Sequence, residues 1–432
     1  MNNNIPDRKI MPEINGMVDF DIMKPQVEIM PNGMKLNVID VGSEDVIRFD
    51  LVIGSGQIDQ SFPLQAMFVN RMLREGTKSM TSAEIAEKLD YYGAWLDLSS
   101  SVNCGFVTLY SLGKYFDITI EILARMVKEA VFPERELRVV ADANKQQFLV
   151  NSQRVDVMSR KEINKVLFGK DHPLGKFAEA GDYDAIGVEM LKDFYGRHYH
   201  SGNCTVYVSG KVTGKVLDSI RNHFGMEKWG NVSEKHVVLM PDPHPLEGKR
   251  FFLEKADAMQ SSLKMGCFFP ERGHEDYHDL RVMTTLLGGY FGSRLMSNIR
   301  EDKGYTYGIA AGMVSYPGST LMVVSTEAAN EYIEPVIKEV YAEMALLQNE
   351  KVPQEELEMV KNYMLGDLCR AYEGAFSIPD AWIFVQTADL KEDFFEKSVE
   401  SVKNITAGRI MELAQKYLLP EKMVEVVAGK MV

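Results

Sequence analysis

The sequence predicts an α+β protein made of two similar halves, in which helices are layered against sheets. Three observations support this prediction. Short segments alternate apolar and polar residues, as strands with one buried face do. Long stretches repeat apolar residues at helical spacing. Short motifs also recur in the same order about half a chain apart, which indicates an internal duplication.

The predicted strands and helices are spread along the whole chain. Strands are expected at 35–39, 47–53, 106–112, 205–208, 262–269, 321–326 and 423–428. Helices are expected at 82–92, 134–150, 185–198, 331–349 and 354–371. The first of these helices follows Thr81, a residue type that suits an N-cap because its hydroxyl accepts a backbone N–H.

Three short motifs recur at offsets of 215 to 220 residues. The pairs are Phe132–Leu137 with Val352–Leu357, Leu64-x-x-Met67 with Leu280-x-x-Met283, and Tyr92-Gly93 with Tyr307-Gly308. Because three coincidences in the same order are rare, they indicate two homologous domains. The loop-like stretch at 225–249 is the natural join. We therefore expect an N-terminal domain at 1–225, a linker at 226–248 and a C-terminal domain at 249–432.

Composition and charge exclude several classes of protein. The chain has 432 residues, 45% of them hydrophobic, with a net charge of −14. An acidic surface repels phosphate backbones, so nucleic-acid binding is not expected. The four cysteines are scattered without a C-x-x-C pair, as in a reduced protein. Neither a signal peptide nor a membrane-spanning run is visible, so we expect a cytoplasmic protein that does not bind membranes.

One string, His274–His278, matches the zinc-binding motif H-E-x-x-H. In zinc peptidases of that type the motif lies inside a helix, so that both histidines face the metal. Here it follows Pro270 and Gly273, and the next helix is expected to start near Asp276, which would leave His274 outside the helix. A solvated loop is therefore the favoured interpretation, and a zinc site with His274 and His278 as ligands is the alternative.

A denser group of residues lies between Leu286 and Ile309, in the string LLGGYFGSRLMSNIREDKGYTYGI. Arg300 closes a short predicted helix there, and Tyr307 follows at the start of a strand. A guanidinium and a phenol brought together across a turn can both donate hydrogen bonds to a carbonyl oxygen or to a developing oxyanion. The alternative is a surface Arg–carboxylate pair beside a half-buried tyrosine.

The pattern Gly-Ser-Arg-Leu…Ile-Arg-Glu-x-x-Gly-x-x-Tyr from Gly292 to Tyr307 resembles the second-domain signature of the pitrilysin/insulinase family of zinc metallopeptidases. The first half agrees, with Met72-Leu73-x-x-Gly76-Thr77 and the Tyr92-Gly93-Ala94 turn. The resemblance spans nearly the whole chain. It implies two homologous α+β domains, each a mostly antiparallel sheet layered with helices, that face each other around a peptide-holding chamber.

The resemblance also implies where the family's zinc site would lie. Members carry an inverted H-x-x-E-H motif on a helix, and a glutamate some seventy-odd residues later completes the zinc ligands. Alignment on Met72-Leu73 places Met67 and Arg71 at the histidine positions and Asn70 at the position of the catalytic base. The third-ligand region, 144–147, reads N-K-Q-Q and ends at Gln147, so it contains no carboxylate.

These substitutions exclude zinc hydrolysis at this site. A thioether such as that of Met67 is a poor zinc ligand. The guanidinium of Arg71 repels a dication, by about 4 kcal/mol per unit charge at 4 Å and an effective dielectric of 20. The amide of Asn70 cannot accept a proton at neutral pH. We therefore expect no cofactor in this chain. Leu96-Asp97-Leu98 is a further departure, since active members show an asparagine and a small residue there.

The leading hypothesis for the function follows from this combination of lost and retained residues. Some members of the family divide the work between two chains, one with the zinc motif and one with only the arginine and tyrosine. This chain resembles the second kind, in which Arg300 and Tyr307 would contact the peptide substrate in the site of a zinc-bearing homologous partner. The alternatives are a catalytically dead peptide-binding scaffold that forms a homodimer, and an active zinc peptidase with relocated ligands.

Overall fold

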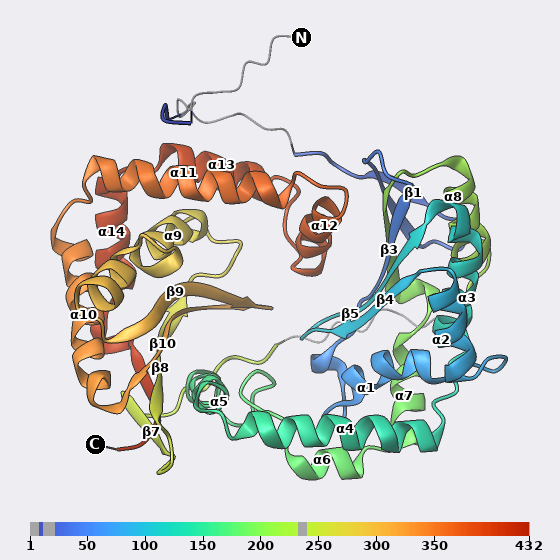
Figure 1. The fold of residues 1–432 in the computed structure, drawn as a ribbon, viewed down its shortest axis with the longest axis horizontal. Coiled ribbons are helices and arrows are strands. Elements are labelled where there is room, and N and C mark those ends of the chain that lie inside the picture. The colour runs from blue at the N-terminus through green and yellow to red at the C-terminus, as the bar shows by residue number, and fades with distance from the viewer. Residues whose placement is uncertain (1–7, 12–21, 232–239, 432) are drawn as a thin grey trace.

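The computed structural model describes residues 8–11, 22–231 and 240–431. It contains two β-sheets with helices packed on them (Figure 1). The N-terminal half lies on the right of Figure 1 and the C-terminal half lies on the left. The predicted linker at 226–248 lies partly outside the described residues, so the domain boundaries stay a prediction.

The first sheet has six strands in the order β1-β2-β6-β3-β5-β4. Its strands are β1 (Gln26–Ile29), β2 (Lys35–Asp40), β3 (Val46–Ile53), β4 (Trp95–Ser100), β5 (Gly105–Leu112) and β6 (Cys204–Gly210). β2 and β6 run parallel, and the other neighbours run antiparallel. β3 is buried along almost its whole length, because it lies inside the sheet and both of its faces are covered.

The second sheet has five strands in the order β7-β11-β8-β10-β9. Its strands are β7 (Arg250–Glu254), β8 (Gln260–Phe269), β9 (Thr306–Tyr316), β10 (Ser319–Ala329) and β11 (Val424–Gly429). β7 and β11 run parallel, and the other neighbours run antiparallel. Without β1, the first sheet has the same strand order and the same directions. The predicted fold class, two homologous α+β halves with mostly antiparallel sheets, is confirmed.

Helices connect and cover the strands in both halves. In the N-terminal half they are α1 (Gln65–Met72), α2 (Ser82–Tyr91), α3 (Phe116–Lys128), α4 (Glu134–Ser152), α5 (Val155–Phe168), α6 (Ala180–Ala185), α7 (Val188–His198) and α8 (Gly214–Ile220). In the C-terminal half they are α9 (Tyr277–Thr284), α10 (Ile333–Asn349), α11 (Gln354–Ala371), α12 (Ser377–Thr387), α13 (Phe394–Asn404) and α14 (Ala407–Tyr417).

Most of the predicted elements are confirmed within a few residues. Thr81 caps α2, since its side chain accepts the backbone N–H of Glu84. The helix predicted at 185–198 begins only at Val188, after the separate α6. The predictions omit three strands and seven helices, namely β1, β4, β7, α3, α5, α6, α8, α12, α13 and α14. Strands β1 and β7 are short and lie at sheet edges, where the alternation of buried and exposed residues is weak.

Each half contributes one helix to the sheet of the other half. α5, from the N-terminal half, packs on β8 and β11 of the second sheet, where the Oγ atoms of Ser159 and Ser262 lie 2.9 Å apart. α12, from the C-terminal half, packs on β6 of the first sheet. There the hydroxyl of Tyr207 donates to the backbone oxygen of Trp382 and to the side chain of Gln386. The two halves are therefore joined by a reciprocal exchange of helices.

A buried ion pair in the first sheet completes the contact with α12. The guanidinium of Arg48 donates to both oxygens of the Asp50 carboxylate, at 2.9 and 3.0 Å, and both side chains are almost fully buried. It also binds the backbone oxygen of Phe376 and the carboxylate of Asp380, each at 2.5 Å. Burial raises the pKa of Asp50 because it disfavours the charged carboxylate, and the charge of Arg48 acts in the opposite direction.

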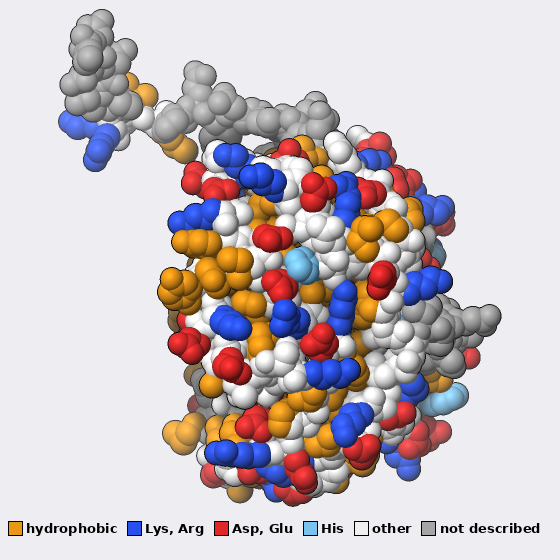
Figure 2. Space-filling model, turned by 90° about the vertical axis from the view of Figure 1, so that its right-hand side faces the viewer, with side chains coloured by type: hydrophobic (Ala, Val, Ile, Leu, Met, Phe, Trp, Pro, Cys, Tyr) orange, Lys and Arg blue, Asp and Glu red, His pale blue; other side chains and the backbone are white. Residues whose placement is uncertain are grey.

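The outer surface of the N-terminal half carries charges of both signs. The face shown in Figure 2, on the side of α2, α3 and α8, has Lys and Arg side chains interspersed with Asp and Glu. Such a surface has no extended region of one sign, which fits an ordinary solvated face. In the part of the chain that the structure describes, no helix combines the length and the apolar character needed to cross a membrane.

Replacing Arg48 by Met is expected to lower the free energy of unfolding by about 3–5 kcal/mol, because Asp50 is left buried without its cation. The measurement is the urea midpoint followed by circular dichroism. Arg125→Met serves as control, since Arg125 forms an exposed pair with Glu121 on α3 whose loss should cost less than about 1 kcal/mol. Equal urea midpoints for Arg48→Met and Arg125→Met would contradict a stabilising role of the buried Arg48–Asp50 pair.

Candidate functional site

Met67, Asn70 and Arg71, three of the positions predicted to form a degenerate zinc site, lie on α1, which packs against β4 and β5. Met67 is half-buried, Asn70 is fully buried and Arg71 is exposed. The helix follows Leu64, which has a left-handed backbone with φ of 75°. Because positions 67, 70 and 71 are one turn apart, they share one side of the helix, as the sequence predicts.

Asn70 ties the helix to the sheet. Its side-chain amide donates to the backbone oxygens of Ser99 on β4, at 2.5 Å, and of Phe106 on β5, at 3.2 Å. Both of its N–H groups are therefore used to hold α1 on the sheet. A carboxylate in the same place would face these two carbonyl oxygens, so the base position has been converted into a structural contact.

Arg71 points toward α4 and donates a hydrogen bond to the side-chain oxygen of Asn144. The amide nitrogen of Asn144 in turn donates to the backbone oxygen of Val140 at 2.6 Å, which fixes its oxygen toward Arg71. Gln147 is exposed and donates instead to Asn151, one turn further along α4, at 3.1 Å. In the third-ligand region, the residue that contacts Arg71 is therefore Asn144 and not Gln147. The sequence alone did not predict this contact.

The donors at these positions do not fit a zinc ion. They comprise a thioether, a guanidinium and carboxamides, and none of these is a thiolate, imidazole or carboxylate of the kind that zinc prefers. Across residues 8–11, 22–231 and 240–431 no group of three or more His, Cys, Asp and Glu side chains is placed to hold a metal. We therefore derive no metal-dependent step at this site.

The H-E-x-x-H string does not bring its two histidines to one helix face. α9 begins at Tyr277 with Asp276 in the N-cap position, as predicted, and His274 lies outside it. The Nδ1 of His274 accepts the backbone N–H of Asp276 at 3.0 Å. His278 lies between the rings of Tyr277 and Phe394. This geometry argues against the relocated zinc site. The expected solvated loop holds only for His274, because His278 lies on α9 and is half-buried against aromatic rings.

Arg300 and Tyr307 are brought together, as predicted. Arg300 lies in a π-helical turn at Met296–Asp302, and its guanidinium carbon lies 5.6 Å from the centre of the Tyr307 ring. The same guanidinium carbon lies 4.5 Å from the centre of the Phe291 ring. The sequence analysis missed Phe291, although it lies within the same glycine-rich string. These cation–π contacts orient Arg300 without neutralising it.

Neighbouring side chains hold the turn that carries Arg300. Asn298 donates to the carboxylates of Glu339 and Glu343 on α10, at 3.1 and 2.7 Å. Arg294 binds Glu356 on α11 through two hydrogen bonds of 2.7 and 2.9 Å. Arg300, by contrast, has no carboxylate partner in the described part of the chain. Its charge is therefore available to a ligand.

A β-bulge directs Tyr307 outward. Thr306 pairs with Ala328 and Ile309 with Thr326, so two residues of β9 face one residue of β10. The bulge is held by the hydroxyl of Thr326, which donates to the backbone oxygen of Gly308 at 2.8 Å. Bulges re-aim side chains in this way, and Tyr307 is 92% exposed. The phenol thus projects into solvent from the edge strand of the second sheet.

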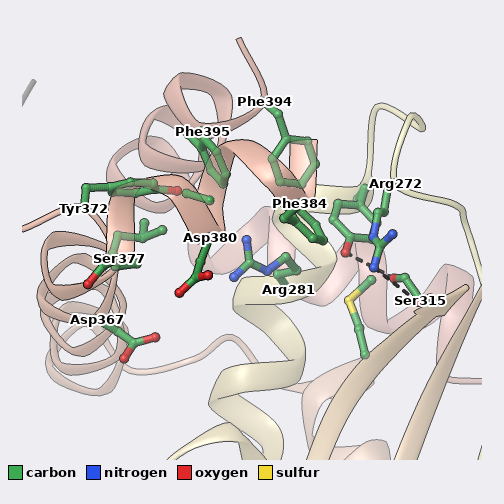
Figure 3. Close-up of a pocket in the computed structure, with 15 residues that line it drawn as sticks. Arg272, Arg281, Ser315, Asp367, Tyr372, Ser377, Asp380, Phe384, Phe394 and Phe395 are labelled. Carbon is green, nitrogen blue, oxygen red and sulfur yellow. Dashed lines mark hydrogen bonds between the residues drawn. The ribbon is translucent and has the colours of Figure 1, made fainter. Parts of the chain in front are cut away.

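A pocket of about 530 Å³ lies between α9, α11, α12, α13 and β9 (Figure 3). Figure 3 shows Arg281 and Asp380 pointing into it, while Arg272 lies on the ring of Phe384. The pocket contains charges of both signs, and Asp380 is the residue that binds Arg48 of the first sheet. The pocket borders the junction between the halves through Asp380, whereas Arg281 and Arg272 donate to Ser398 and to the backbone oxygen of Ser315 within the C-terminal half.

Comparisons with known proteins agree with the expected resemblance. The family described as "Peptidase M16 inactive domain" matches residues 185–364. "Uncharacterized zinc protease YmxG" of Bacillus subtilis is 24% identical over 80% of this chain and 84% of its own. A peptidase M16 inactive domain from Pseudomonas fluorescens has a similar structure, with a TM-score of 0.85, 22% identity and coverage of 95% of this chain and 99% of that chain.

A protease from Helicobacter pylori also has this fold, with a TM-score of 0.81, 17% identity and coverage of 94% of this chain and 99% of that chain. Pitrilysin and insulinase are peptidases of family M16. The resemblance drawn from the sequence is therefore confirmed: the chain is peptidase-like and lacks the zinc motif.

After treatment with a chelator and incubation with one equivalent of zinc, the desalted chain is expected to retain far less than one equivalent. The reason is that Met67, Asn70 and Arg71 supply no anionic or imidazole donor. Elemental analysis by mass spectrometry measures the retained metal. Stoichiometric zinc that disappears in His278→Ala would instead restore the relocated site.

His278 is expected to make the protein less stable in mild acid. Burial between aromatic rings lowers the pKa of His278 to about 4, whereas an unfolded histidine titrates near 6.5. Between these values the unfolded state binds more protons, so stability is retained above about pH 6.5 and declines as the pH falls toward 4. Urea midpoints at pH 7 and pH 5 test this, and His278→Gln should show the smaller decline. An identical fall in urea midpoint for the original protein and His278→Gln would contradict this role of His278.

Proposed function

Taking the chain as a homologue of the M16 peptidases that lacks their zinc motif, we propose that it is the non-catalytic subunit of a two-chain zinc peptidase. Its partner is a homologous chain that carries the intact inverted H-x-x-E-H motif. In the assembled enzyme this chain supplies Arg300 and Tyr307 to the partner's site. The partner supplies the zinc ion, whose chemistry in such sites is to activate water.

The observation that carries this proposal is the contrast between the two halves. In the first half, every zinc position is occupied by a side chain with another use, as Asn70 and Arg71 show. In the second half, Arg300 and Tyr307 lie together at the surface, and the phenol is almost fully exposed. A side chain that only stabilised its own fold would gain nothing from that exposure. The pair is therefore suited to act on a group brought by another chain.

The chemistry of the pair follows from its donors. The guanidinium and the phenol both donate hydrogen bonds, so they can bind the peptide carbonyl and the oxyanion that develops from it. Phe291 supports the guanidinium through a cation–π contact that uses none of its N–H groups as a hydrogen bond to a carboxylate. When the partner covers the site, water is excluded, and hydrogen bonds to a developing charge become stronger.

Co-expression with a homologous zinc-motif chain from the same genome is expected to give a complex that cleaves a quenched fluorescent peptide. Arg300→Ala and Tyr307→Phe should each lower kcat by about 10²-fold, since one oxyanion donor is typically worth that much or more. Matched controls are Arg370→Ala on α11 and Tyr363→Phe, whose ring stacks on Tyr290. Both controls should retain activity.

The co-expression experiment also distinguishes the two-chain peptidase from the peptide-binding homodimer. Full activity in both Arg300→Ala and Tyr307→Phe would remove the proposed role of the pair. A chain that associates only with itself, and that adds nothing to the activity of the zinc-bearing homologue, would favour the peptide-binding homodimer instead. Size-exclusion chromatography with light scattering measures the association directly.

A further inference from the structure

One side of α4 presents a row of amide side chains beside the degenerate zinc site. Asn144, Gln147 and Asn151 are three or four residues apart, so they share one face of the helix. Gln147 is exposed, and the other two are half-buried. We call these three residues the amide row. Amide groups both donate and accept hydrogen bonds, which suits them to the backbone of an extended peptide.

Two cations, Arg71 and Lys161, lie beside this part of α4. Arg71 contacts Asn144. The Nζ atom of Lys161, from α5, lies 4.5 Å from the centre of the Phe148 ring and 5.8 Å from that of Phe177. Asn144 and Phe148 are one helical turn apart, which is about 6 Å along the axis. The two cations therefore border the same short stretch of α4, although they come from different helices.

Neither cation has an acidic partner in the part of the chain that the structure describes. Arg71 contacts the amide of Asn144, and Lys161 contacts the two aromatic rings just named. Burial against those rings lowers the pKa of Lys161, and the charge of neighbouring Arg160 adds to this effect. Two uncompensated cations at one place are unexpected in a chain of net charge −14, because so many carboxylates are present to pair with them.

The carboxylates near this surface are already used. Asp184 binds Lys145, and Glu162 binds Lys165. Asp182 accepts the backbone N–H of Glu179 at the start of α6. Of the other arginines on α4, Arg138 donates to the backbone oxygens of Asp184 and Ile186, whereas Arg135 is exposed on the opposite face of the helix. The charge of Arg71 and Lys161 is thus left for a group from outside this chain.

We propose that the amide row, with Arg71 and Lys161, is a binding site for a carboxylate-bearing peptide. One Nη of Arg71 is held by Asn144, and its remaining N–H groups can bind a carboxylate through two hydrogen bonds. The amide row then binds the adjoining peptide backbone. The position that binds a metal in active relatives would have become an anion site. The inference rests on the proposed function only in taking a peptide as the ligand.

Isothermal titration calorimetry on the full chain, without any partner, tests the site with four synthetic decapeptides. Two are capped at both ends and differ only in carrying several Glu or the matching Gln residues. The capped Glu peptide is expected to bind at least about tenfold more tightly than its Gln counterpart. The other two are the same Gln peptide with a free or an amidated C-terminus, which shows whether a terminal carboxylate suffices.

The variants Arg71→Gln and Lys161→Gln should each weaken binding of the Glu peptide by about tenfold. Arg135→Gln is the matched control, since it removes one exposed cation from the opposite face of the same helix. Its affinity should equal that of the original chain. Equal affinity of the original chain for Glu and Gln peptides, or equal losses in all three variants, would overturn the proposal.

This experiment is separable from the test of the proposed function. It requires neither the zinc-bearing partner nor Arg300 and Tyr307, and it measures binding rather than cleavage. A complex that cleaves peptides but whose isolated subunit does not discriminate Glu from Gln would refute the anion site alone. Discrimination by the isolated chain, with no effect of Arg300→Ala in any complex, would refute the catalytic contribution alone.

Discussion

The reciprocal exchange of helices is the constraint on which the rest of the structure depends. α5 leaves the first half to cover the second sheet, and α12 leaves the second half to cover the first sheet. Each sheet would otherwise expose an apolar face, so neither half is complete alone. On the second sheet the contact is close, because a Cβ at Gly266 would come within 3.0 Å of the Ile163 side chain. On the first sheet it is polar, through Arg48 and Asp380.

The exchange also explains how a degenerate site keeps a defined shape. α5 follows α4 directly, so the position of α5 on the second sheet also fixes α4 beside α1. Asn70 holds α1 on β4 and β5, and Arg71 bridges α1 to α4. Arg71 thus joins α1 to α4, the two helices that carry the predicted zinc-ligand positions. Loss of the metal-binding residues did not require loss of the fold.

The Arg300–Tyr307 pair is positioned by local backbone structure, whereas the surface around Arg71 and Lys161 is positioned by the packing of helices. Tyr307 is exposed because a bulge adds one residue to β9, and Arg300 is placed by a π-helical turn; both are local irregularities of regular elements. The surface around Arg71 and Lys161, in contrast, is assembled from three helices. Its charge depends on which carboxylates other cations have taken, and therefore on packing across the whole N-terminal half.

The sequence by itself determined the fold class, the duplication and the residue types at each family position. Periodicity and motif spacing are local properties, so they predicted most strands and the pairing of Arg300 with Tyr307. The tertiary structure alone decided that α5 and α12 exchange, that Asn144 rather than Gln147 meets Arg71, and that Phe291 lies against Arg300. Those facts depend on contacts between residues far apart in the chain, and such contacts leave no periodic signal in a single sequence.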